Sequence, residues 1–284
     1  MRITILALST AAMLNGQTMH SAPGPKGKLF IIGGGDKSPA MMKELVRLAG
    51  FGPRDYIVAL PMASEMPDSS VIWTREDFQD TGAPEVIGFN FTGKENMTPA
   101  RLDSVRHAKL IFIGGGDQLR FMQVVQNTPL YSAIHEAYNN GAIIAGTSAG
   151  AAVMTAKMLT GNQKRHLVYT GAFTTIEEGN IELAEGLGLL RGAIIDQHFI
   201  KRQRLNRLLS VAIENPSELC IGIDESTAIL VEGGQARVLG ESQVIMIRNT
   251  RKTHAAKNGL LGVQGLSLDI YLPGESFSLV QGKN

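Results

Sequence analysis

The sequence is poor in cysteine, in surplus charge of either sign and in long apolar runs. Its 284 residues include a single cysteine, Cys220, which excludes an internal disulfide and a cysteine-rich metal site. The 27 basic and 26 acidic residues nearly cancel, so no global field attracts nucleic acid or an acidic membrane surface. Beyond Leu14, no apolar run approaches the roughly 20 residues of a membrane-spanning helix. With 44% hydrophobic residues, the composition indicates a folded, enzyme-sized chain.

The first 25 residues differ from the rest. Arg2 precedes an uncharged, mostly apolar run from Ile3 to Leu14, and small and polar residues follow. This layout is typical of a secretory signal peptide, and its apolar run is too short to span a bilayer. A disordered cytosolic extension is the alternative, for which such a run would be unusual. We therefore expect residues 1–25 to be a signal peptide and spacer, residues 26–284 to form one domain, and the protein to be secreted or periplasmic.

From Lys28 onward, apolar stretches typical of buried strands alternate with amphipathic stretches typical of helices. The first helix shows its own boundaries, with Ser38 as N-cap, Pro39 in the first turn and Gly50 at the end. Such alternation predicts an α/β fold in which helices cover both faces of a mostly parallel sheet. Residues 218–249 read instead as consecutive strands with a Gly-Gly turn, and residues 265–280 also resemble strand. We expect these C-terminal strands to be antiparallel.

The stretch AIIAGTSAGAAVM, residues 142–154, places Ser148 where an apolar strand gives way to small residues that favour a helix. Gly146 and Gly150 permit a sharp turn, which pushes the serine hydroxyl out of the sheet. A helix that starts here leaves unpaired amides, that of Ala149 first, beside any negative charge that develops. The pattern predicts a nucleophile.

A second amide for such a charge can come from the Gly-Gly-Gly-Asp loop that ends the preceding strand, through Gly115 or Gly116. Two such loops occur, at residues 33–36 and 114–117. A phosphate-binding role is the weaker interpretation, because neither loop has the spacing of a Walker motif or of a dinucleotide-binding motif. We therefore expect an oxyanion hole formed by Ala149 with Gly115 or Gly116.

A serine nucleophile needs a base, and the base needs an acid that orients it. Of the six histidines, His198 is favoured because it lies at an expected strand end, with Glu225 or Asp224 at another strand end as the acid. A competing set, Ser148 with Asp224 and His254, has the chain order of α/β-hydrolase esterases. We rank it second because His254 lies in a basic stretch that is typical of a surface loop.

Four motifs, in this order along residues 28–230, resemble the cyanophycinase branch of the S51 serine peptidases, a family that also includes aspartyl dipeptidase. They are GGGDQ at 114–118, AGTSAGA at 145–151, DQHF at 196–199 with arginines after it, and GIDESTA at 222–228. The resemblance implies a three-layer α/β/α sandwich similar to class I glutamine amidotransferases. It also implies that Ser148 is the nucleophile, His198 the general base and Glu225 the orienting carboxylate.

The same resemblance implies a substrate pocket. Its residues would be Gln118, Asp196, Gln197, Arg202, Arg204 and Arg207. Guanidinium forks bind carboxylates in bidentate fashion, which suits a substrate rich in aspartate. The charges of these arginines alone would favour a solvated basic face of a helix. Only their position directly after the DQHF motif, as in the family, favours a substrate pocket. Asp196 could meet a cationic substrate group or orient His198.

The implied reaction is hydrolysis of cyanophycin, a poly-aspartate that carries arginine on its β-carboxyls, to β-aspartyl-arginine dipeptides. An acyl-enzyme mechanism needs neither metal nor cofactor, and we expect none. The alternatives are a peptidase for short aspartyl or isoaspartyl peptides, the esterase above, and an inactive protein that binds acidic peptides. The expected partner is a peptide or polymer rich in aspartate and arginine, not nucleic acid, and the resemblance suggests a homodimer.

Overall fold

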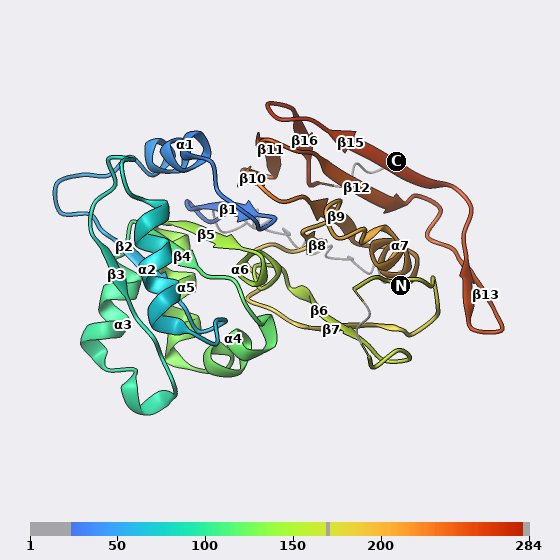
Figure 1. The fold of residues 1–284 in the computed structure, drawn as a ribbon, viewed down its shortest axis with the longest axis horizontal. Helices are drawn as coiled ribbons and strands as arrows, with labels where there is room; N and C mark the ends of the chain where they lie inside the picture. The colour runs from blue at the N-terminus through green and yellow to red at the C-terminus, as the bar shows by residue number, and fades with distance from the viewer. Residues whose placement is uncertain (1–23, 169–170, 281–284) are drawn as a thin grey trace, which may run out of the picture.

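The main sheet has eight strands in the computed structural model, which describes residues 24–168 and 171–280. They are β1 (Lys28–Ile32), β2 (Ile57–Leu60), β3 (Val86–Gly88), β4 (Leu110–Ile113), β5 (Ile143–Thr147), β10 (Thr227–Glu232), β11 (Gln235–Gly240) and β16 (Ser276–Ser278). Their order in the sheet is β16-β11-β10-β1-β5-β4-β2-β3 (Figure 1). The neighbours from β1 to β3 pair in parallel, whereas β10, β11 and β16 pair antiparallel. The mostly parallel sheet with antiparallel C-terminal strands is confirmed.

Helices alternate with the parallel strands, as the sequence predicts. They are α1 (Pro39–Ala49), α2 (Pro67–Asp77), the 3-10 helix η1 (Lys94–Asn96), α3 (Pro99–Arg106), α4 (Gln118–Val125), α5 (Pro129–Asn140) and α6 (Ala149–Ala152). Ser38 accepts a hydrogen bond from the Met41 amide, and Gly50 ends α1 in the left-handed conformation that glycine tolerates best. Within residues 24–168 and 171–280, no helix combines the length and the apolar character needed to cross a bilayer.

A second sheet has four strands, in the order β15-β12-β9-β8. They are β8 (Ala193–Gln197), β9 (Leu219–Ile223), β12 (Val244–Asn249) and β15 (Leu266–Tyr271). The pattern of apolar strands predicts a single sheet, with the DQHF motif at the same edge as Ser148. The structure differs because β10 pairs with the open edge of β1, so β8 pairs with β9 instead. DQHF therefore ends a strand of the second sheet.

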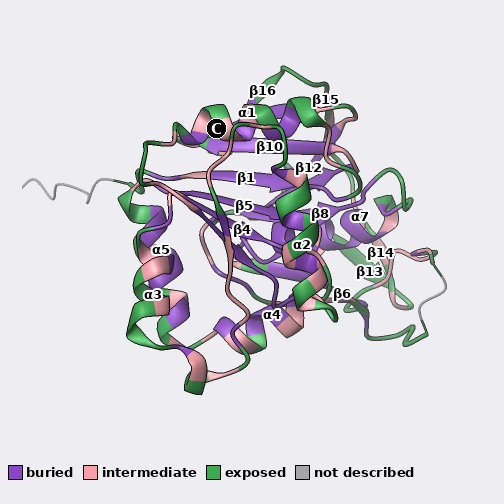
Figure 2. Cartoon of the chain, turned by 60° about the vertical axis from the view of Figure 1, so that its left-hand side comes forward, coloured by how far each residue is buried: buried purple, intermediate pink, exposed green. Residues whose placement is uncertain are grey.

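The two sheets share a core. The helix α1 packs on one face of the main sheet through a cluster that includes Phe30 and Phe112. On the other face, α3 to α6 pack together with one face of the second sheet, which contributes Ile195 and Ile221. The helix α7 (Leu205–Glu214) covers the far face of that second sheet. The central strands of both sheets are buried in this arrangement, whereas the edge strand β15 is partly exposed and most other exposed positions lie on the helices and loops (Figure 2).

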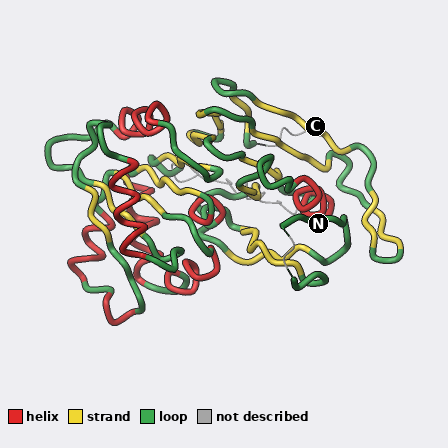
Figure 3. Tube along the Cα trace, viewed as in Figure 1, coloured by secondary structure: helices red, strands yellow, loops and turns green. Residues whose placement is uncertain are grey.

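Two antiparallel pairs complete the fold: β6 (Lys157–Gln163) with β7 (Ile181–Glu185), and β13 (Ala255–Lys257) with β14 (Leu260–Gly262). Most of the first pair falls in residues 161–190, to which the sequence analysis assigned no role. Figure 3 shows β6 and β7 running beside the short helix α6, whereas β13 and β14 form a hairpin at the end of the molecule. The first pair therefore lies next to Ser148.

Candidate active site

Ser148 occupies a strained corner between β5 and α6. Its φ of 53° and ψ of −109° lie outside the regions that ordinary side chains favour. The amide of Ser148 donates to the Ile32 carbonyl at 3.1 Å, which ties the corner to β1. A methyl group on Gly146 would overlap the Gly150 carbonyl, and one on Gly150 would overlap the Ile113 carbonyl. The turn predicted from these glycines is present, and it needs both.

Three side chains meet at this corner. The Ser148 Oγ lies 2.8 Å from Nε2 of His198, and Nδ1 of His198 lies 2.6 Å from Oε1 of Glu225. Because an ionised carboxylate can only accept, Nδ1 carries the proton and donates it to Glu225, which leaves Nε2 to accept from the serine hydroxyl. This is the geometry of an activated serine nucleophile.

The first Gly-Gly-Gly-Asp loop makes this meeting possible, and the sequence analysis gave it no role. The carbonyl of Gly33 accepts from the amide of His198 at 2.7 Å. A side chain on Gly34 would overlap the imidazole of His198, and the Cβ of a residue in place of Gly35 would lie 2.8 Å from that of Glu225. The signal was available, because the sequence has two copies of this loop at the ends of parallel strands.

His198 is held mainly in its neutral form. Burial lowers its pKa below the ordinary value of 6.5; the hydrogen bond to Glu225 opposes this effect, and the cations Arg202 and Arg204 add to it. The residue is 7% exposed and lines a cavity. A neutral imidazole is the form that can take the serine proton.

The backbone beside Ser148 offers amides for an oxyanion. Ala149 is the first residue of α6, where helical amides have no partner within the helix. Gly115 faces the serine, since a Cβ added to it would lie 3.5 Å from the Ser148 Cβ. The Cβ position of Gly116 instead points into the Ala63 carbonyl. Among the described residues, the amides of Gly115 and Gly116 donate to no protein acceptor.

A cavity of about 310 Å³ opens in front of the serine. Its lining includes five of the six residues expected in the substrate pocket, namely Gln118, Gln197, Arg202, Arg204 and Arg207. The wall also contains Thr160 and Asn162 of β6, which the sequence analysis did not identify. The lining carries more positive than negative charge, so the cavity is suited to an anionic group.

Asp196, the sixth residue, is buried beneath that wall. It is 1% exposed, and both of its carboxylate oxygens accept from the guanidinium of Arg207, with Nε at 2.8 Å. The expected direct contact of Asp196 with a substrate therefore does not fit its position. Its carboxylate is used to orient Arg207, whose guanidinium also lies 4.6 Å from the ring centre of Phe173.

The three arginines differ in their surroundings. Arg204 donates to the carbonyl oxygen of Gln197 at 2.6 Å and also to its side-chain oxygen. Arg202 is 47% exposed, with its Nε 3.9 Å from Oε1 of Glu225. The stretch KRQRLNR, residues 201–207, directly after the DQHF motif, predicts the first turns of a helix. In the structure α7 begins only at Leu205, because Gln203 adopts a left-handed backbone conformation. Arg202 is therefore on a turn at the rim, nearest to solvent.

The competing set of Ser148, Asp224 and His254 is not assembled. Asp224 accepts from the amides of Ile200 and Lys201 at 3.0 and 2.9 Å, and from the Ser242 hydroxyl at 2.8 Å. His254 lines a different pocket, near β13 and β14. The carboxylate thus holds the backbone that follows His198 and does not reach His254.

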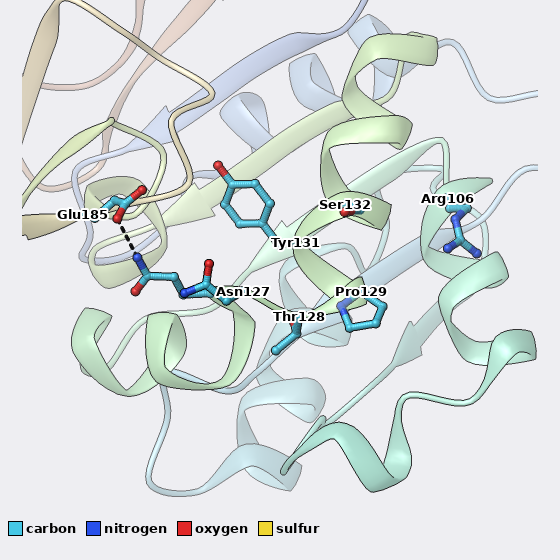
Figure 4. A pocket seen from close by; sticks show the side chains of 8 residues that line it. Arg106, Asn127, Thr128, Pro129, Tyr131, Ser132 and Glu185 are labelled. Atoms are coloured by element: carbon cyan, nitrogen blue, oxygen red, sulfur yellow. Dashed lines mark hydrogen bonds between the residues drawn. The ribbon is translucent and has the colours of Figure 1, made fainter.

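A larger cavity, about 680 Å³, lies beside the start of α5 and shares no lining residue with the one at Ser148. Figure 4 shows its wall, where Gln126 donates to Glu185 at 2.7 Å and Arg106 lies at the opposite end. Among the described residues, neither the Ser132 nor the Thr128 hydroxyl in its lining is hydrogen-bonded to Glu185. In residues 24–168 and 171–280, no three His, Cys, Asp or Glu side chains are grouped to hold a metal ion.

Comparison with known proteins agrees with this geometry. The family model described as peptidase family S51 matches residues 29–239, which include Ser148, His198 and Glu225. The chain belongs to peptidase family S51. As a member of this family it is a serine-type peptidase.

Individual relatives of this S51 peptidase fall into two groups. A cyanophycinase from Thermosynechococcus vestitus is 32% identical over 277 residues, which cover 93% of this chain and 82% of the relative. A peptidase E from Actinobacillus pleuropneumoniae is 28% identical over 151 residues, 50% of this chain and 59% of the relative. The crystal structure of a peptidase from an acI-B1 actinobacterium has the same fold, with a TM-score of 0.66, 24% identity, and coverage of 89% of this chain and 96% of that one.

Proposed function

We propose that this S51 peptidase hydrolyses aspartyl peptide bonds, and that its substrate is cyanophycin, which it degrades to β-aspartyl-arginine dipeptides. The similarity to cyanophycinases over nearly the whole chain supports the substrate class. The single observation that carries the reaction type is the hydrogen-bonded series from Ser148 through His198 to Glu225. The cationic cavity in front of the serine supports a substrate with free carboxylates.

The chemistry follows from these positions. The Ser148 Oγ attacks the scissile carbonyl carbon while Nε2 of His198 takes the hydroxyl proton, and Glu225 stabilises the imidazolium that forms. The amides of Ala149 and Gly115 donate to the oxyanion of the tetrahedral intermediate, with Gly116 beside them. The imidazolium then protonates the leaving amine and the C–N bond breaks. Water, activated by the same imidazole, hydrolyses the acyl-enzyme and restores the serine.

The surrounding arginines are assigned to binding. Arg202, at the rim, would bind a substrate carboxylate, while Arg204 and Arg207 keep the inner wall positive. Gln118 and Gln197 also line this wall. In this proposal Asp196 is a positioning residue for Arg207, because its carboxylate is buried.

The test compares purified wild-type protein with Ser148→Ala on cyanophycin and on short β-aspartyl peptides. We expect the wild type to release β-aspartyl-arginine, and Ser148→Ala to lose at least about 1,000-fold in kcat. His198→Ala should be as inactive, whereas His254→Ala serves as the matched control and should retain full activity. Activity that survives in His198→Ala and is lost in His254→Ala would instead support the esterase arrangement.

A second candidate is a peptidase for short aspartyl peptides. The partial similarity to peptidase E favours it, although that similarity covers only half of this chain. Cleavage of the short peptides without release of dipeptide from the polymer would select it. An inactive binding protein would be indicated if a fluorophosphonate probe, which reacts with activated serines, failed to label Ser148 in the folded protein.

Export and assembly are proposals from the sequence and the family resemblance. We propose that the protein is exported, since residues 1–25 have the layout of a signal peptide; residues 1–23 lie outside the described part of the chain. N-terminal sequencing of protein from the culture medium or periplasm should show a start near Lys26, and a start at Met1 would contradict it. We propose a homodimer, for which sedimentation velocity should give about twice the mass of the single mature chain, and a mass equal to that of one chain would contradict it.

A further inference from the structure

We propose that Glu182 forms a second subsite of the active site, which binds the positively charged guanidinium of the substrate's arginine branch. The inference rests on the proposed function, because it names the group that discriminates an arginine-bearing aspartyl substrate from other aspartyl peptides. It concerns the ribbon of β6 and β7 beside α6 (Figure 1).

The ribbon is irregular where it passes the catalytic cavity. The pairing of β6 with β7 shifts register between Leu159 and Gln163, and Gly161 between them has a φ of 94°. Bulges of this kind turn side chains out of their regular alternation and are common next to active sites. Gln118 holds the bulge, since its Nε2 donates to the carbonyls of Leu159 and Thr160 at 2.8 and 2.6 Å.

The bulge directs two donors at one carboxylate. The Thr160 hydroxyl and the Asn162 side-chain amide donate to Oε2 of Glu182 at 2.8 and 2.9 Å. These hydrogen bonds, that of Asn162 first, lower the pKa of Glu182, with a smaller contribution from the charge of Lys164, so the group is ionised at neutral pH. In the described part of the chain, Oε1 of Glu182 accepts no hydrogen bond. A fixed, charged carboxylate with one oxygen available is suited to a guanidinium.

This carboxylate lies in a cavity that adjoins the catalytic one. The cavity measures about 400 Å³ and is lined by Glu182, Lys164, His166 and Leu167, and it shares Gly161 and Asn162 with the cavity at Ser148. The catalytic cavity is dominated by arginines, whereas the adjoining one presents Glu182. A substrate that bears both a carboxylate and a guanidinium matches this arrangement, with arginines in one cavity and a carboxylate in the next.

Two basic side chains in the adjoining cavity have to be considered. His166 is hydrogen-bonded through Nε2 to Glu177 at 2.7 Å, which is a separate pair. Lys164 acts on Glu182 through its charge and, among the described residues, forms no ion pair with it, so the carboxylate stays accessible. Its positive charge nevertheless weakens the field of Glu182, so the subsite requires a ligand that makes directed hydrogen bonds, as a guanidinium does.

The test is binding to protein that carries Ser148→Ala, so that no turnover is required. Calorimetry would compare β-aspartyl-arginine with β-aspartyl-citrulline, which has nearly the same shape without the charge. We expect Glu182→Gln to weaken binding of the arginine dipeptide about tenfold, the loss of one charge-assisted hydrogen bond, and to leave binding of the citrulline dipeptide unchanged. The glutamine oxygen still accepts from Thr160 and Asn162, so the wall is retained.

The matched control is Glu185→Gln, which removes a carboxylate from the other end of the same strand and should change neither affinity. Equal losses for both dipeptides in Glu182→Gln would show a structural role and overturn the proposal. So would unchanged affinities, or a protein that binds neither dipeptide. The proposed function is judged separately, by release of dipeptide from cyanophycin with wild-type protein. Glu182-dependent preference for arginine without polymer cleavage would refute that function and leave the subsite standing.

Discussion

The two Gly-Gly-Gly-Asp loops, residues 33–36 and 114–117, have the same four letters and follow parallel strands, yet they do different work. The first loop follows β1, and its glycines make room for the ring of His198 and the Cβ of Glu225. The second follows β4, and its Gly115 faces Ser148 with an available amide. The first loop thus accommodates the base, and the second presents donors toward the nucleophile.

The aspartates of the two loops differ in the same way. Asp117 is the N-cap of α4 and accepts from the amides of Leu119 and Arg120 at 2.7 and 3.2 Å. Asp36 caps nothing, because Ser38 caps α1 in its place. Identical four-residue loops follow two different parallel strands here, so their neighbours in the fold decide the role. The second sheet packs over the first loop, and α2 with the end of β2 lies beside the second.

The largest expected effect comes from filling the first loop. A methyl group in Gly34→Ala would overlap the imidazole of His198 at a φ of 108°, so the base must move. We expect kcat/KM to fall about 1,000-fold, within the range for loss of a general base. Fluorophosphonate labelling of Ser148 should be lost together with peptidase activity. Gly262→Ala, where the nearest atom would be 3.8 Å away, is the matched control and should retain full activity.

The same change in the second loop should cost less. In Gly115→Ala the new Cβ meets that of Ser148 at 3.5 Å, an ordinary contact, and the amide of residue 115 is retained. We expect a fall of about tenfold in kcat with the serine still labelled, because an oxyanion donor is displaced and not removed. Equal losses of activity in Gly34→Ala and Gly115→Ala would contradict the different roles assigned to the two loops.

A smaller effect, on pH dependence, concerns the imidazole that the first loop accommodates. Arg202 lowers the pKa of His198, so removing its charge in Arg202→Met should raise that pKa. The base must be neutral, so the acidic limb of the kcat/KM profile should move to higher pH. Lys201→Met is the control, and it should leave that limb in place. A limb that stays fixed or moves to lower pH in Arg202→Met would show that this charge does not act on the base.

The smallest effect concerns the two aspartates. Asp117→Ala removes an N-cap and should lower the free energy of unfolding by about 1 kcal/mol. Asp36→Ala should change it by less than about 0.5 kcal/mol, since the side chain caps no helix. Urea denaturation followed by circular dichroism measures both. If the two variants lost equal stability, the loops would be equivalent in this respect.

The sequence was most informative where structure is local. The cap at Ser38, the stop at Gly50 and the turn at Ser148 each depend on a few neighbouring residues, and each is present in the structure. The alternation of strands and helices gave the parallel part of the main sheet for the same reason. The residues themselves left open whether Asp224 or Glu225 orients His198, because both directly follow the same strand, β9. Only the packing of β9 in the folded chain decides which of the two carboxylates reaches the imidazole.

The sequence was least informative where distant segments pair. The strands β8 and β9 are buried on both faces, so their continuous apolar pattern does not reveal which strands they join. Asp196 accepts hydrogen bonds from Arg207, so its carboxylate is not available to a substrate, which the sequence alone did not reveal. Glu182 was missed because it lies opposite a bulge in β6, which no periodicity marks, and because its donors Thr160 and Asn162 are about twenty residues away along the chain.

The division of the catalytic groups between two sheets has a consequence for biosynthesis. Ser148 ends a strand of the main sheet and His198 ends a strand of the second, while Glu225 lies in the crossing from β9 to β10. During synthesis on the ribosome, Ser148 therefore emerges well before His198, the base that accepts its proton. The growing polypeptide cannot act as a protease until both sheets have docked, so hydrolysis is delayed until the molecule is nearly whole.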